Sequence, residues 1–69
     1  MMKVGDFIQS SAYVGENGIV IEVERDADGP WYQVMWLKVN KRYFGYKGSR
    51  PLPIKEWVRG HEIEARDNS

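Results

Sequence analysis

The chain contains no cysteine and one histidine, His61, among its 69 residues. Disulfides and thiolate metal sites are therefore excluded, and one imidazole cannot build a zinc site unaided. No stretch approaches the roughly 20 apolar residues of a membrane-spanning helix, and residues 1–6 lack the apolar core of a signal peptide. The absence of cysteine fits a reducing compartment. We therefore expect a cytoplasmic protein with no metal, no cofactor and no membrane contact.

The small size of the chain limits its stability. We expect a single domain over residues 1–69, with a polar tail at 66–69 that frays. A chain of this size hides only roughly 60% of its unfolded surface, and so small a core supplies about 3–5 kcal/mol of net stability. Disulfides and thiolate metal sites are excluded by composition. We therefore expect a partner, either another protein or a second copy in a homo-oligomer.

Charge is balanced overall but unevenly distributed. The formal net charge is zero, which argues against a protein dominated by attraction to phosphate backbones. Residues 4–28 nevertheless carry six acidic side chains and one basic one, whereas residues 38–59 carry seven basic side chains and one acidic one. The second segment is therefore a candidate for local binding of an anion.

Two β-rich runs, Gly18–Arg25 and Trp31–Lys38, dominate the chain. Both are rich in β-branched and aromatic residues. Between them lies Asp26–Pro30, in which an Asp-Gly pair suits positive φ and the proline suits a bend. The pattern predicts a β-hairpin.

Alternation assigns faces to these two strands. The residues of the first strand predicted to face the core are Ile19, Ile21 and Val23. One face of the second strand is formed by Tyr32, Val34 and Trp36. Its other face is also largely apolar and consists of Gln33, Met35, Leu37 and Val39. Because a small domain cannot easily cover a strand on both faces, this pattern indicates a contact surface.

The other elements are short. Lys3–Ile8 is expected to open the domain, with a bend or bulge at Gly5-Asp6 before a short strand and with Val4 and Phe7 in the core. Asn17-Gly18 is the strongest two-residue turn pattern. After the hairpin, Tyr43–Tyr46 is expected to form a strand.

The C-terminal part is expected to contain one helical element and one strand. Ile54–Arg59 has Pro53 at its start and Gly60 just past its end, which favours one or two helical turns. His61–Ala65 alternates and is expected to be the last strand.

This order of elements predicts an all-β fold, a small five-stranded SH3-like barrel with one short helical turn before the last strand. Lys3–Ile8 is similar to the K-x-G-D-x-V opening of KOW-, Tudor- and other SH3-like barrels. Gly15–Val23 resembles their second strand and Tyr32–Trp36 their third, with Trp57 where a turn places an aromatic residue on the core. The resemblance covers Lys3 to Ala65 and extends to small uncharacterised proteins of bacteriophages and bacteria.

The resemblance implies a fold and a binding role rather than an activity. Tudor-type members bind methylated side chains through an aromatic cage, and KOW members bind nucleic acid or ribosomal and polymerase partners. SH3 domains proper bind proline-rich peptides. No complete aromatic cage maps onto this sequence.

No catalytic arrangement is apparent. A nucleophile and base would need a serine beside His61, but the chain has no nucleophile elbow, and Ser10 and Ser11 suit loop hydrogen bonding. The pairs Glu22/Glu24 and Glu62/Glu64 have the spacing of a solvated strand face, and no phosphate-binding motif is present. We expect a protein that is not an enzyme.

Two surfaces are candidates for binding. The first is a protein interface, because aromatic residues and methionine are enriched at interfaces; its residues are Trp31, Met35, Leu37 and Phe44. The alternative is that the chain itself covers Met35 and Leu37. We therefore expect a noncatalytic interaction or structural module that binds protein or self-associates.

The second candidate is a nucleic-acid surface within the basic and aromatic segment 38–59. Its residues are Lys41, Arg42, Tyr43, Tyr46, Lys47 and Arg50. Cations for phosphates and rings for base stacking suit single strands, with each stacked base worth about 1–3 kcal/mol. The alternative is an edge strand whose basic side chains prevent strand addition.

Overall fold

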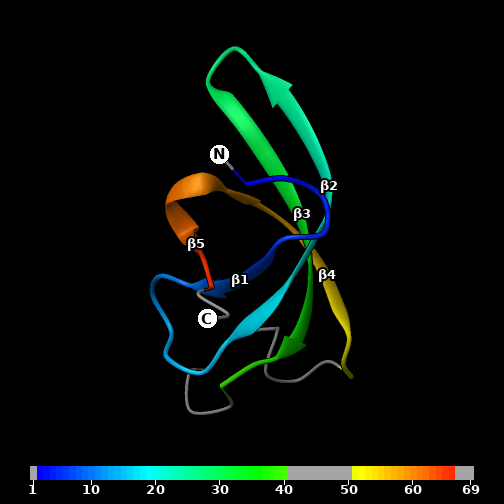
Figure 1. Ribbon diagram of the computed structural model, residues 1–69, viewed down its shortest axis with the longest axis vertical. Coiled ribbons are helices and arrows are strands. Elements are labelled where there is room, and N and C mark those ends of the chain that lie inside the picture. The colour runs from blue at the N-terminus through cyan, green and yellow to red at the C-terminus, as the bar shows by residue number, and fades with distance from the viewer. Residues whose placement is uncertain (1, 41–50, 67–69) are drawn as a thin grey trace.

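The computed structural model describes residues 2–40 and 51–66. In chain order its elements are β1 (Phe7–Ser10), β2 (Asn17–Asp26), β3 (Gly29–Lys38), β4 (Ile54–Arg59), the 3-10 helix η1 (Gly60–Glu62) and β5 (Ile63–Ala65) (Figure 1). The strands form one antiparallel sheet of order β4-β3-β2-β1-β5. The expected all-β class is confirmed, and the described residues form five antiparallel strands. The sheet is open, and in the described ranges β4 and β5 are its edges.

The predicted β2–β3 hairpin is confirmed and forms the long ribbon of Figure 1. Gly29 closes the turn with φ of +117°, and the Asp28 amide donates to Asp26 Oδ1 at 2.9 Å. Pro30 lies within β3 opposite Arg25 instead of forming a bend. A proline is tolerated there because the pairing of β3 with β4 begins only at Trp31.

The core is formed by one face of the sheet and draws on all five strands. Its buried apolar residues are Ile8, Val20, Tyr32, Val34, Trp36, Ile54, Val58 and Ile63. The indole N–H of Trp36 donates to Glu56 Oε1 at 3.2 Å, so its polar atom has a partner. The predicted inward face of β3 is confirmed.

The predicted inward face of β2 is partly wrong. Val20 is fully buried, whereas Ile19 and Ile21 are only half-buried. Ile19 pairs with Met35, which is on the face of β3 that points away from the core. A register shift between Val20 and Glu22 adds one residue to β2 and changes the alternation, so that Val23 still packs against the core.

Gly18 does not form a turn, contrary to the sequence prediction. Asn17 and Gly18 both belong to β2, and Gly18 is buried. A Cβ atom at Gly18 would overlap the Met35 carbonyl oxygen and lie 3.0 Å from Val34 Cγ1. The glycine is therefore needed for the close approach of β2 and β3.

The core residue of β1 is Ile8, and the prediction of Val4 and Phe7 as core residues is wrong. Gly5, at φ of +95°, turns the chain before β1, and its amide donates to the Val20 carbonyl at 2.8 Å. Phe7 pairs with Ile19 and shares the outward face with it.

Residues 54–59 form strand β4, so the prediction of helical turns there is wrong. Ile54 and Val58 are buried while Trp57 between them is exposed, which is the two-residue period of a strand. A proline suits the residue before a strand as well as the start of a helix. The helical turn, η1, follows directly after β4. There the Arg59 amide N–H donates to Glu62 Oε2 at 2.8 Å.

Two further observations complete the fold. The strand predicted at Tyr43–Tyr46 lies outside the described residues. Within residues 2–40 and 51–66, no helix has the length and apolar character needed to cross a membrane.

Candidate protein interface

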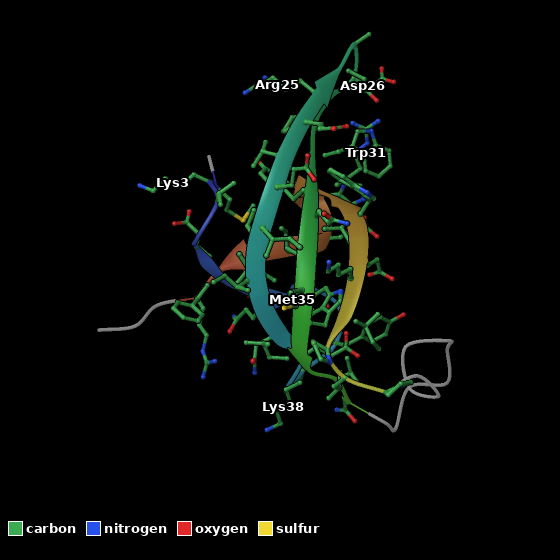
Figure 2. The ribbon with its side chains drawn as sticks, turned by 90° about the vertical axis from the view of Figure 1, so that its right-hand side faces the viewer. Lys3, Arg25, Asp26, Trp31, Met35 and Lys38 are labelled. Carbon is green, nitrogen blue, oxygen red and sulfur yellow. The ribbon has the colours of Figure 1, made fainter. Side chains whose placement is uncertain are left out.

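Apolar side chains of β2, β3 and β4 lie on the face of the sheet that points away from the core. We call four of them the outer-face cluster: Ile19, Trp31, Met35 and Trp57. The register places Ile19 beside Met35, and it places Trp57 beside Gln33, between Trp31 and Met35 along β3. Figure 2 shows Trp31 and Met35 along β3. The cluster therefore extends over β2, β3 and β4.

The cluster is open to solvent. Trp57 is 39% exposed, and Ile19, Trp31 and Met35 are half-buried. Phe7, 47% exposed, continues the row from Ile19 onto β1. Glu24, Trp31 and Trp57 line a shallow depression of about 260 Å³. Such contiguous apolar groups are typical of a binding surface.

Trp31 is held in place by an ion pair at the end of the hairpin. Its Nε1 donates to Asp26 Oδ2 at 2.8 Å, and the guanidinium of Arg59 lies 3.8 Å from the centroid of its ring. Arg59 also donates to both carboxylate oxygens of Asp26, at 3.1 and 2.9 Å. One ring face of Trp31 is thus used within the chain, and its orientation is set before any partner binds.

These contacts keep Asp26 charged. The hydrogen bonds from Arg59 lower the pKa of its carboxyl well below the ordinary value of 3.8, and those from Trp31 and from the Asp28 amide lower it further. The carboxylate therefore persists into acid. Its side chain is 45% exposed, so the pair orients Trp31 more than it stabilises the fold.

Charged side chains flank the cluster, and their sign differs between the two sides. Glu22 and Glu24 are exposed on β2. Lys55 is exposed on β4, where it pairs with Met35 in the register. Arg59, also on β4, has its charge balanced by Asp26. The outer face is therefore acidic along β2 and basic along β4.

The structure brings together only part of the predicted protein interface. Trp31 and Met35 share the outer face. Leu37 is 48% exposed at the end of β3, where the register shift leaves it without a partner in β2. Phe44 lies outside the described residues. The prediction omitted Trp57, although alternation from Ile54 to Val58 could have placed it on the exposed face.

The predicted nucleic-acid surface cannot be located in the same way. All of its residues, Lys41, Arg42, Tyr43, Tyr46, Lys47 and Arg50, lie outside the described ranges. It therefore stays a prediction.

A second recess, of about 440 Å³, lies on the core side of the sheet and has both polar and apolar walls. It is lined by Ser10, Ser11, Ala12, Tyr13, Trp36, Glu56, Val58, His61 and Glu62. Ser11 Oγ donates to the His61 carbonyl oxygen at 2.8 Å, and Ser10 Oγ accepts the amides of Ala12 and Tyr13 at 3.2 and 3.1 Å. Both hydroxyls thus hold backbone. In the described part of the chain, no group of three or more acidic or histidine side chains could hold a metal ion.

Glu16 is a buried residue that sequence reasoning missed. It is 3% exposed, and its carboxylate accepts the Asn40 amide at 3.3 Å. Asn40 Nδ2 in turn donates to the Val14 carbonyl at 2.8 Å. These bonds tie the loop before β2 to the chain after β3, which is a structural role.

Comparison with known proteins adds no relative: the chain matches no protein-family model, no curated protein and no solved structure. The SH3-like resemblance therefore stays a prediction.

Proposed function

We propose that the protein is a noncatalytic binding domain that docks another protein chain on its outer-face cluster. One observation carries the proposal. β3 is buried on the face of Tyr32 and Val34 and still presents Trp31 and Met35 on the other. A solvated strand face ordinarily carries polar residues, so these side chains need another explanation, and contact with a protein supplies one.

The chemistry of the cluster suits a protein ligand. Tryptophan and methionine are enriched in interfaces, and tryptophans near the centre often dominate the binding energy. The clamp of Asp26 and Arg59 on Trp31 reduces the ordering entropy that binding must overcome. Trp57 beside it adds a second large ring.

The noncatalytic part of the proposal is supported by how the candidate nucleophiles are used. Ser11 bonds to the backbone of His61 rather than to its imidazole, and Ser10 accepts two backbone amides. A serine nucleophile would need a base within hydrogen-bond reach of its hydroxyl.

We also propose that the sheet bends into an SH3-like barrel. Four features support this proposal: the strand order, the contribution of all five strands to the core, the bulge in β2, and the 3-10 turn before β5. Nuclear Overhauser contacts between β4 and β5 would test it. Two edges separated by water would contradict it.

Photo-crosslinking tests the docking face. A photoreactive amino acid replaces Trp57 in one variant and Val14, an exposed loop residue, in another. Both are expressed in cells of the source organism. We expect position 57 to give a discrete adduct with one further polypeptide, identified by mass, and Met35→Lys to abolish that adduct. No adduct at 57 beyond that at 14 would refute the proposal.

A further inference from the structure

We infer that the chain docked on the outer-face cluster is a second copy of this protein, related to the first by a two-fold axis parallel to β3. This inference rests on the proposed function and adds the identity of the partner. It is carried by the distribution of charge across the outer face.

A second copy must match this face with itself. The face has an apolar centre on β3, exposed Glu22 and Glu24 on β2, and exposed Lys55 on β4. The acidic and basic sides are thus separated by one strand. A face that is apolar in the middle and of opposite charge on its two sides is complementary to a copy of itself, provided that the sides are exchanged.

Two symmetric ways of stacking the sheets are available, and the charges choose between them. A two-fold axis parallel to β3 lays β3 on its symmetry mate and places β2 opposite the partner's β4. A rotation about this axis keeps the position along the strand, so Glu24 then lies opposite the partner's Arg59, and Glu22 lies two residues along the strand from the partner's Lys55. An axis perpendicular to the strands places β2 on β2 and β4 on β4, so that like charges face each other. Only the first arrangement is electrostatically favourable.

The size of the chain agrees with such a dimer. A standard interface buries about 800 Å² on each partner, which is roughly a sixth of the 4819 Å² accessible surface of this chain. Stacked sheets would form a second apolar layer beside the core. That layer supplies stability that a chain without disulfides otherwise lacks.

Sedimentation with matched charge variants tests the inference. Lys55→Glu reverses the charge on the basic side of the outer face, and Arg66→Glu makes the same charge change at an exposed residue after β5. We expect the wild type to dimerise reversibly, Lys55→Glu to raise the Kd roughly tenfold, and Arg66→Glu to leave it unchanged. The Lys55→Glu effect should diminish at high salt. Circular dichroism confirms that each variant folds.

Cross-linking tests the arrangement itself. Because the chain has no cysteine, a single introduced thiol is unique. A mixture of Glu22→Cys and Lys55→Cys proteins, treated with a short thiol-reactive linker, should give a heterodimer in high yield. Lys55→Cys alone should give little, since the two Lys55 residues lie on opposite sides of the axis.

The outcomes separate the inference from the proposed function. A strictly monomeric wild type overturns the inference, whereas an adduct of a different polypeptide at position 57 would leave the proposed function standing. A dimer that is insensitive to Lys55→Glu, or one cross-linked best between two copies of position 55, overturns the two-fold arrangement parallel to β3.

Discussion

Gly18→Ala should destabilise the fold far more than the addition of a single methyl group suggests. Ile8 and Trp36 flank Gly18 on the two neighbouring strands. The added Cβ would overlap the Met35 carbonyl oxygen, 3.1 Å from the carbonyl carbon and 3.0 Å from Val34 Cγ1, where ordinary contacts begin at 3.4 Å. The obstacle is backbone, so β3 must shift rather than a side chain rotate.

The magnitude follows from this geometry. Overpacking a core costs about 1–3 kcal/mol, and a clash with backbone in the central hairpin belongs near the top of that range. If the wild type has about 4 kcal/mol of stability, roughly 15% of Gly18→Ala molecules would be unfolded at 25 °C. The Tm should fall by about 12–24 °C.

Two other glycines provide controls. Gly15 has φ of +88° and open space around it, so Gly15→Ala should cost only the strain of the left-handed conformation, about 1–2 kcal/mol. Gly60 meets Tyr32 Cε2 at an ordinary 3.5 Å, so Gly60→Ala should cost least. Urea unfolding of the three variants measures the order. A Gly18→Ala protein as stable as Gly60→Ala would refute the close approach of β2 and β3.

Three further predictions concern the clamp and the basic segment. Asp26→Asn should lower the free energy of unfolding at neutral pH. Because the pKa of Asp26 is lowered in the folded state, the difference in stability from the wild type should be full above pH 3.8 and shrink below it. Urea unfolding down to about pH 2 measures this difference, and a difference that does not change with pH would contradict the prediction. Arg59→Lys keeps the charge but loses the paired bonds and the stacking, so the near-ultraviolet circular dichroism of Trp31 should weaken; an unchanged spectrum would show that the clamp does not fix the ring. If residues 41–50 bind nucleic acid, fluorescence anisotropy should detect single-stranded oligonucleotides with an affinity that falls with salt and is lost in Lys41→Ala/Arg42→Ala; no binding at low salt would end that hypothesis.

The sequence predicted the hairpin and both faces of β3 because local rules determine them. Gly29 is the residue that positive φ requires, and β3 alternates without interruption from Trp31 to Trp36. β2 could not be assigned in the same way. Its bulge arises from pairing with β3 and changes the alternation within the strand. Ile19 and Ile21 were predicted to face the core, but Val20 is the residue that is buried.

The helical prediction at 54–59 failed because the local pattern fits both structures. Pro53 and Gly60 fit the ends of a helix, and Ile54 and Val58 share one face in a helix as well as in a strand. Pairing with β3 decides for the strand, and the sequence does not show that pairing. This error also concealed Trp57. A residue assigned to a helical turn over the core became the most exposed side chain of the outer-face cluster. The prediction therefore placed Trp31 and Met35 of β3 on the outward face but missed Trp57 of β4, and the interface itself stays a proposal.

Met35 links the outer face to the core, because its carbonyl lies against Gly18 and its side chain lies on the outer face. The Met35 carbonyl is the group that Gly18 must avoid, and the Met35 side chain lies in the outer-face cluster. Any shift of β3 that relieves a clash at Gly18 therefore moves the docking surface as well. A strand apolar on both faces transmits packing changes from one layer to the other. Loss of self-association in a core variant thus needs a measured folded fraction before it is attributed to the interface, whereas Lys55→Glu acts on the outer face alone.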